Sequence, residues 1–201
     1  MFCHKKVIAV YSGSFNPFHY GHLDIIRDLY ETPSIDKVLV VVSPKNPGKS
    51  ESVYIQSPSD RFLAVKSVID SEGMTDKVEV SDIEFTRTQP IYTVETLREI
   101  RTLYPDDIIF YVAGADSLEK IQRWKNAKEL LCDFSLMVFP RSGYDLPEII
   151  KATEEKYPGA QILPMMKMPR EISSTEIRRR IEAGEDYSEL TPVKVDNGRE
   201  N

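Results

Sequence analysis

Two histidines three residues apart, His19 and His22, stand where a helix should begin, directly after a turn rich in Gly, Ser and Pro. The preceding run, Val7–Val10, is apolar and β-branched, as expected of a buried parallel strand. Residues 12–14 allow a sharp backbone turn that exposes N–H groups, and the helix directs its positive end into that turn. Two imidazoles and free amides at one point favour an anion, most naturally phosphate.

Two other interpretations of these histidines stay open. A histidine at a helix start is often only a cap or a surface residue. A zinc site could instead combine His19 and His22 with Cys3 and His4. The zinc site is less favoured, because Cys3 and His4 precede the strand and should lie at its opposite end.

A second pattern able to bind an anion lies near residue 175. Ser173 and Glu176 form a capping box, so that a helix should begin at residue 174 with free amides and hydroxyls at its start. Arg178 follows about one turn inside, whereas Arg179 and Arg180 are expected to face solvent. The alternative is an ordinary capped, basic surface helix.

Strand-like and helix-like segments alternate between these two patterns. Strands are predicted at Val7–Tyr11, Lys37–Val42, Val78–Phe85, Ile108–Ala113, Ser135–Phe139 and Gln161–Leu163. Helices are predicted at Leu23–Tyr30, Ser59–Ile69, Val94–Leu103 and Leu146–Lys156, the second of them capped by Ser57 with Asp60. This order predicts βαβ units and an α/β fold with a parallel sheet, whose ligands bind at the carboxyl ends of the strands.

Composition limits the class of protein. The 201 residues, 41% of them hydrophobic and 29% charged, suit one globular domain, expected over 1–195 with a disordered polar tail at 196–201. A net charge of −6 argues against broad binding to nucleic acid. Two cysteines cannot build a disulfide framework, and neither a signal peptide nor a membrane span is evident, so a cytoplasmic protein is expected.

The residues 13–23, GSFNPFHYGHL, resemble the H-x-G-H signature of the nucleotidylyltransferase superfamily. The residues 172–178, ISSTEIR, resemble its second signature, which binds the triphosphate. The resemblance implies a Rossmann-like, doubly wound parallel sheet of five or six strands with helices on both faces. It also implies that His19, His22 and Arg178 are catalytic. The ATP-binding residues that it implies are Gly13, Ser14, Phe15, His19, His22, Gly114, Asp116, Ser174, Thr175 and Arg178.

Three further segments resemble bacterial nicotinate-nucleotide adenylyltransferases: QPIYTVETL at 89–97, GADSL at 114–118 with a following tryptophan, and FPRSGY at 139–144. The acceptor-binding residues that this resemblance implies are Lys45, Tyr92, Thr93, Trp124 and Arg141. Thr93 or Asp116 could instead be a plain helix cap, and Trp124 could pack in the core. Arg141 could lie near the nicotinate carboxylate, the nucleotide or a phosphate.

The chain departs from the family pattern at two places. The usual G-G-T-F-D-P is here SGSFNP, in which Ser14 keeps a hydroxyl and Asn16 removes a negative charge. The usual P-P-H-K loop is replaced by residues 44–49, where Lys45 or Lys49 could supply the missing cation. The whole loop, residues 43–56, is long enough to be a mobile flap, although a plain connector would look the same.

The implied reaction is transfer of the adenylyl group of ATP to nicotinate mononucleotide, giving nicotinate adenine dinucleotide and pyrophosphate in NAD biosynthesis. Such a reaction depends on alignment and charge neutralisation, with Mg²⁺ bound mainly through the ATP phosphates. The alternatives are phosphopantetheine adenylyltransferase, because residues 13–26 look like its opening, nicotinamide mononucleotide as acceptor, and a non-catalytic nucleotide-binding regulator. Neither nucleic acid nor a membrane is an expected partner, and the sequence leaves a homo-oligomer open.

Overall fold

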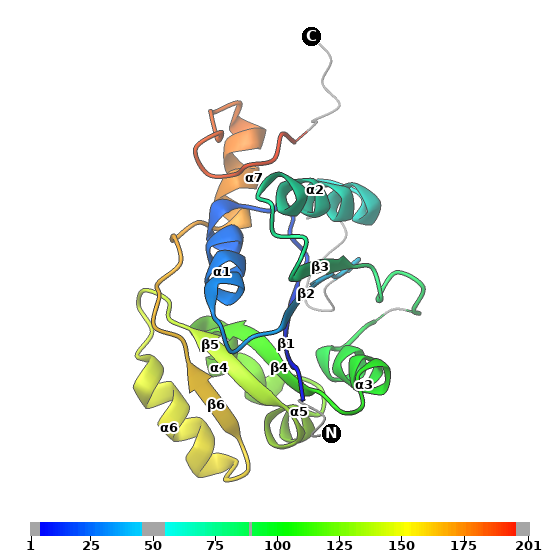
Figure 1. Cartoon of the computed structure of the whole chain (residues 1–201). Coiled ribbons are helices and arrows are strands. Elements are labelled where there is room, and N and C mark those ends of the chain that lie inside the picture. Colours follow the sequence, from blue (N-terminus) through cyan, green and yellow to red (C-terminus); the bar gives the residue numbers. More distant parts are fainter. Residues whose placement is uncertain (1–4, 46–54, 89, 196–201) are drawn as a thin grey trace.

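A computed structural model describes residues 5–45, 55–88 and 90–195. Its centre is one six-stranded parallel sheet, in which the strands follow the order β3-β2-β1-β4-β5-β6 (Figure 1). The strands are β1 (Val7–Gly13), β2 (Lys37–Val42), β3 (Val78–Ser81), β4 (Ile108–Gly114), β5 (Ser135–Phe139) and β6 (Gln161–Pro164). The direction of the strand order reverses between β1 and β4, and a crevice opens at such a point in doubly wound sheets. The predicted α/β fold is confirmed.

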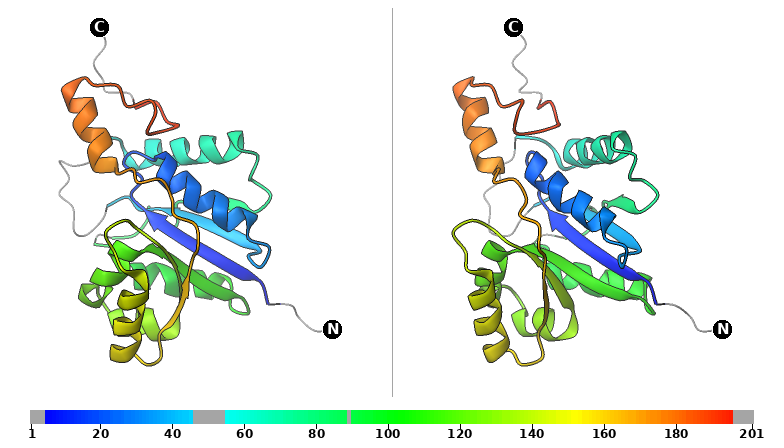
Figure 2. Two further views of the ribbon diagram at one scale, coloured as in Figure 1. Left: turned by 90° about the vertical axis from the view of Figure 1, so that its left-hand side faces the viewer. Right: turned by 60° about the vertical axis from the view of Figure 1, so that its left-hand side comes forward.

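Both faces of the sheet are covered by helices, as the alternation of apolar residues along β1 requires. Ile8 and Val10 point to one face, and Ala9 and Tyr11 point to the other. Figure 2 shows the two resulting layers. One layer contains α1 (Tyr20–Glu31) and α2 (Pro58–Ser71), and the other contains α3 (Thr93–Leu103), α4 (Ala115–Lys120), α5 (Ala127–Asp133) and α6 (Leu146–Lys156).

The predicted helix starts are confirmed where a cap was visible in the sequence. Ser57 caps α2 by accepting a hydrogen bond from the Asp60 amide at 3.1 Å. Ser173 does the same for α7 (Ser174–Ala183), accepting from the Glu176 amide at 3.1 Å. A cap of this kind stabilises a helix by about 1 kcal/mol, and it also fixes where the free amides of the first turn point.

Three predictions about the elements were wrong, and two helices were missed. The first strand, predicted to end at Tyr11, continues to Gly13, so Ser12 and Gly13 pair with β2 and do not form the predicted turn. The strand predicted at Val78–Phe85 ends at Ser81, because the chain turns at residues 82–85. α1 begins at Tyr20, three residues earlier than predicted. The helices α4 and α5, with the single turn η2 (Ile121–Arg123) between them, were not predicted, because each is too short to show a helical period in the sequence.

The segment after β6 returns across the molecule and packs on the loop between β1 and α1 (Figures 1 and 2). The Tyr20 amide donates to the Leu190 carbonyl at 3.1 Å, and the Thr191 hydroxyl donates to the Phe18 carbonyl at 2.6 Å. Arg170 pairs with Asp24 on α1 at 2.6 Å. These contacts bring α7 beside the start of α1, although about 150 residues separate them in the chain.

Candidate active site

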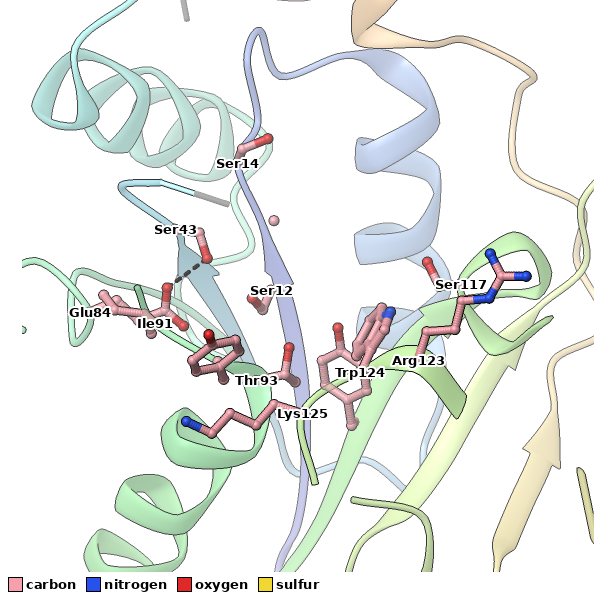
Figure 3. Close-up of a pocket in the computed structure, with 13 residues that line it drawn as sticks. Ser12, Ser14, Ser43, Glu84, Ile91, Thr93, Ser117, Arg123, Trp124 and Lys125 are labelled. Atoms are coloured by element: carbon pink, nitrogen blue, oxygen red, sulfur yellow. Dashed lines mark hydrogen bonds between the residues drawn. The ribbon is translucent and has the colours of Figure 1, made fainter. Parts of the chain in front are cut away.

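A cavity of about 520 Å³ lies at the carboxyl ends of the central strands (Figure 3). Five of the predicted site residues line it, namely Gly13, Ser14, Tyr92, Thr93 and Trp124. The sequence did not single out the other lining residues, which are Ser12, Ser43, Glu84, Ile91, Tyr111, Ser117, Arg123 and Lys125. Since Gly13 and Ser14 also begin the histidine loop, the cavity and the histidines share one wall.

His19 and His22 lie face to face at the start of α1. Their ring centroids are 3.5 Å apart, with 19° between the ring planes. Each ring accepts a hydrogen bond from the backbone amide of the other residue: His22 N–H donates to Nδ1 of His19 at 3.3 Å, and His19 N–H donates to Nδ1 of His22 at 3.2 Å. The two histidines therefore form a capping box of their own.

This reciprocal cap fixes the tautomer of both rings. Because each Nδ1 accepts a hydrogen bond, a neutral ring carries its proton on Nε2. Burial, together with the nearby Arg141 guanidinium and against the opposing effect of Asp24, lowers the pKa of His19 from 6.5 to about 3. His19 is thus a neutral N–H donor at physiological pH, suited to a phosphate oxygen and not to storing a proton.

Gly21 and Phe15 support the histidine pair. A Cβ on Gly21 would lie 2.6 Å from the Arg170 carbonyl oxygen and 3.2 Å from Nδ1 of His19, so the position has room only for glycine. Phe15 is 1% exposed, and its ring meets the His22 ring edge-on with centroids 5.0 Å apart. Its buried side chain leaves the main chain as the part of Phe15 that could contact ATP.

The start of α7 meets the histidine loop, as the second signature predicts. Ser174 Oγ donates to the Pro17 carbonyl at 3.0 Å, and Arg178 Nη1 donates to the Asn16 carbonyl at 2.7 Å. Arg178 Nη2 also donates to the Thr175 hydroxyl at 3.0 Å. The residues assigned to the triphosphate thus come together from both ends of the chain.

Arg179 and Arg180 lie farther along the same helix. Arg179 is exposed and pairs with Glu176 at 2.9 Å, as expected of a solvent-facing residue. Arg180 is only half-exposed, because it is held by Glu176 at 3.0 Å and by Glu189 at 2.8 Å. The expectation that it faces solvent was therefore only partly correct.

Arg141, just after β5, and Asp116, in the first turn of α4, lie close together. Arg141 Nε lies 3.9 Å from Asp116 Oδ1, and the Arg141 charge acts on His19. A Cβ on Gly114 would lie 2.5 Å from Asp116 Oδ1 and 3.3 Å from Arg141 Nε.

The acceptor side of the cavity is aromatic. Trp124 is half-buried, and its ring meets Tyr111 edge-on with centroids 6.2 Å apart. It thus packs on the core and lines the cavity at once. The Lys125 ammonium lies 4.4 Å above the centre of the Tyr92 ring. Tyr111 is buried, which raises its pKa to about 12, so its hydroxyl stays protonated.

The sequence left open that Thr93 or Asp116 is a plain helix cap, and in the structure neither of them is one. Tyr92, and not Thr93, is the residue before α3, and it places no side-chain oxygen on the first amides of that helix. Gly114, and not Asp116, is the residue before α4. Plain capping therefore accounts for neither Thr93 nor Asp116.

Two buried charged residues of the site were missed. Arg61 on α2 is 1% exposed and donates to the carbonyls of Ser14, Ser43 and Pro44, which ties the ends of β1 and β2 together. Glu84 is 2% exposed and accepts from the Ser43 hydroxyl at 2.6 Å. Neither stands in a recognisable motif, and a single charge within an amphipathic segment normally indicates an exposed residue.

The structure leaves some predicted residues untested. Lys45 is half-buried at the end of a described range and does not line the cavity. Lys49, most of the 43–56 loop and the tail at 196–201 lie outside the described residues. Cys3 and His4, which the zinc alternative needs, lie there too. Among the residues that are described, no helix is long and apolar enough to cross a membrane.

Comparison with known proteins places the chain in a family. The family model described as Cytidylyltransferase-like matches residues 10–180. The probable nicotinate-nucleotide adenylyltransferase of Clostridium tetani is 34% identical over 198 residues, covering 96% of this chain and 95% of that protein. The enzyme of the same name from Flavobacterium johnsoniae is 34% identical over 188 residues, covering 94% of this chain and 93% of that one.

A solved structure has the same fold. It is Plasmodium falciparum nicotinic acid mononucleotide adenylyltransferase complexed with NaAD, with a TM-score of 0.77 at 22% identity, covering 90% of this chain and 86% of that one. The likeness extends over nearly the whole of both chains. With its histidine pair, its second anion-binding helix and these relatives, the chain belongs to the nicotinate-nucleotide adenylyltransferase family of cytidylyltransferase-like proteins.

Proposed function

We propose that this protein transfers the adenylyl group of ATP to nicotinate mononucleotide, forming nicotinate adenine dinucleotide and pyrophosphate. One observation carries the proposal: the end of β1 at Gly13 and the next residue, Ser14, line the acceptor cavity, and the chain then continues into the loop before α1, where Arg178 donates to the Asn16 carbonyl and His19 caps the helix. A mononucleotide in the cavity would thus present its phosphate to a triphosphate held at that loop.

The reaction needs alignment more than proton transfer. A phosphate oxygen of the acceptor forms a bond to the α-phosphorus of ATP while the bond from that phosphorus to the pyrophosphate oxygen breaks. His19 and His22, as neutral Nε2–H donors, would stabilise the charge that develops on the phosphate oxygens. Ser174, Thr175 and Arg178 would hold the leaving pyrophosphate at the N-terminus of α7.

Nicotinate mononucleotide is favoured over the nicotinamide compound by charge. Thr93, the first residue of α3, lines the cavity, and Tyr92 makes no side-chain cap hydrogen bond, so the positive end of the helix dipole would act on the acceptor. Lys125 and Arg123 add two cations to the same cavity. The nicotinate carboxylate would meet positive potential there, with its ring against Trp124.

Members of the nucleotidyltransferase class generally use a divalent metal, and we assign Mg²⁺ to this one. In the described part of the chain, no group of three or more His, Cys, Asp or Glu side chains could hold a metal ion. The residues present therefore suit an ion whose ligands are mainly phosphate oxygens and water. When bound, Mg²⁺ would neutralise part of the triphosphate charge.

The phosphopantetheine enzyme is less well supported as an alternative. The aromatic wall of Tyr92 and Trp124 suits a flat ring, and pantetheine has none. The regulator hypothesis would need a damaged phosphate site, whereas His19, His22 and Arg178 are all in place. A cytoplasmic location is part of the same proposal.

The test is release of pyrophosphate from ATP and Mg²⁺ with nicotinate mononucleotide, nicotinamide mononucleotide or phosphopantetheine as acceptor. We expect the highest kcat/KM with nicotinate mononucleotide. Turnover with this acceptor no faster than the acceptor-free blank would refute the proposal, and fastest turnover with phosphopantetheine would establish the alternative.

A further inference from the structure

The wall of the cavity contains a buried carboxylate that the mechanism above does not use. Glu84 is 2% exposed, and each of its oxygens accepts one hydrogen bond: Oε2 from the Ser43 hydroxyl and Oε1 from the Thr96 hydroxyl, both at 2.6 Å. Its charge also acts on Tyr111 across the floor of the cavity. The two hydroxyls hold the carboxylate in one position.

Within the described ranges, no cation forms an ion pair with this carboxylate. Throughout the described residues, no Lys, Arg or His nitrogen lies within ion-pair distance of Glu84. Two arginines bind the residues that hold Glu84: Arg87 donates to the Thr96 hydroxyl at 3.0 Å and forms an ion pair with Glu99, and Arg61 donates to the Ser43 carbonyl at 2.7 Å. A buried carboxylate is costly unless positive charge compensates it. A positively charged ligand group in the cavity would provide that compensation.

The opposite wall of the cavity is aromatic and cationic. Figure 3 shows Glu84 and Ser43 on one side and Trp124 with Arg123 on the other. An aromatic face attracts a ring that carries positive charge, and a carboxylate attracts the same ring. The cavity therefore suits a flat cationic ring whose acidic substituents reach Arg123 and Lys125.

We propose that Glu84 is a specificity-determining residue that recognises the positive charge of an oxidised pyridinium ring in the acceptor. This inference rests on the proposed function, because nicotinate mononucleotide carries such a ring. The inference adds that the enzyme discriminates by the redox state of the acceptor ring: oxidised mononucleotides are selected over their reduced, 1,4-dihydropyridine forms. The reduced form has the same carboxylate, ribose and phosphate, but its ring is neutral.

The test compares kcat/KM for the oxidised and the reduced nicotinate mononucleotide in the wild type, Glu84→Gln and Glu84→Asp. Glu84→Gln keeps the size of the side chain and removes its charge, so we expect the preference for the oxidised acceptor to fall on the order of tenfold. Glu84→Asp keeps the charge and should retain most of the preference, even where its absolute rate is lower. Glu79→Gln is the matched control, because Glu79 is exposed and pairs with Lys37 far from the cavity.

The outcomes separate this inference from the proposed function. An equal loss with both acceptors in Glu84→Gln would overturn the inference and would assign Glu84 to the ribose or to the structure of the wall. The proposed function would survive that result, since it fails only when the wild type does not use nicotinate mononucleotide. Using a ratio of two acceptors on one protein sample also removes the effect of partial unfolding.

Discussion

The imidazole of His19 stacks on that of His22 with 3.5 Å between the ring centroids, and each ring caps the amide of the other residue. The two residues proposed as phosphate donors therefore also form the start of α1. A change at either histidine affects the chemistry and the helix together, and the two effects need separate variants.

His22→Ala should lower kcat/KM by the equivalent of about 2 to 4 kcal/mol, because one donor to the developing charge is lost. It should also destabilise the protein by about 1 kcal/mol through the lost cap. In His22→Gln the new side chain can still accept a hydrogen bond from the His19 amide. This variant should therefore be as stable as the wild type but keep the low kcat/KM of His22→Ala. Steady-state kinetics and thermal unfolding check both, and near-normal kcat/KM in both variants would remove His22 from the site.

His19 should make folding depend on pH. Its pKa is about 3 in the folded state against 6.5 when unfolded, so between these values the unfolded chain binds more protons. Its contribution to the free energy of unfolding is complete above pH 6.5 and decreases as the pH falls toward 3. Denaturant unfolding at several pH values gives the free energy of unfolding as a function of pH. Between pH 3 and 6.5 this free energy should rise less steeply with pH in His19→Gln than in the wild type. An unchanged slope would show that His19 is not held neutral by the fold.

Gly21→Ala should disturb the histidine pair, since the added methyl group would lie 2.6 Å from the Arg170 carbonyl. We expect a loss of stability of about 1 to 3 kcal/mol together with a lower kcat. Gly159→Ala is the control, because its Cβ would make only ordinary van der Waals contacts with Cys132, the nearest of them to the sulfur at 3.4 Å. Equal behaviour of the two variants in thermal unfolding and kinetics would contradict the crowding at Gly21.

Arg61→Met should destabilise the protein by about 3 kcal/mol or more, because it removes a buried guanidinium and leaves three partly buried carbonyls without their donor. Arg98→Met removes an exposed arginine paired with Glu129 and should cost less than about 1 kcal/mol. Denaturant unfolding measures both changes. A cost for Arg61→Met as small as that for Arg98→Met would mean that the ends of β1 and β2 hold together without it.

Arg178→Ala should raise the KM for ATP and lower kcat by roughly tenfold or more, through loss of a cation at the pyrophosphate. Arg179→Ala should change neither by more than about twofold, because Arg179 is exposed and pairs with Glu176 and Glu185. Initial rates at varied ATP concentration give both constants. Indistinguishable rates for the two variants would exclude a role of Arg178 at the phosphates.

The sequence was most informative where one local pattern determined both structure and chemistry. Ser173 with Glu176 predicted the start of α7, and the position of the histidine pair after a turn rich in Gly, Ser and Pro predicted that both histidines lie at the entry of α1. Both depend on contacts within four residues, which a linear pattern records. The parallel sheet follows from the alternation of elements together with general rules of connection, whereas the order of its strands is known from the structure.

The sequence was least informative where a contact joins distant parts of the chain. Glu84 was read as the end of a strand, and nothing beside it indicates that Ser43, 41 residues earlier, would hold its carboxylate. Arg61 lies on an amphipathic helix, and only the assembled sheet brings three carbonyls to its guanidinium. Such residues are recognised from tertiary contacts, which have no period in the sequence.

The return of residues 165–191 onto the loop before α1 makes half of the proposed triphosphate site depend on the last part of the chain. Arg178 reaches the Asn16 carbonyl across 162 positions, and Thr191 reaches the Phe18 carbonyl across 173. The six strands and the residues that line the cavity all precede α7 in the chain. A chain that ended before α7 would therefore contain the whole sheet but lack Ser174, Thr175 and Arg178, and we expect it to be inactive.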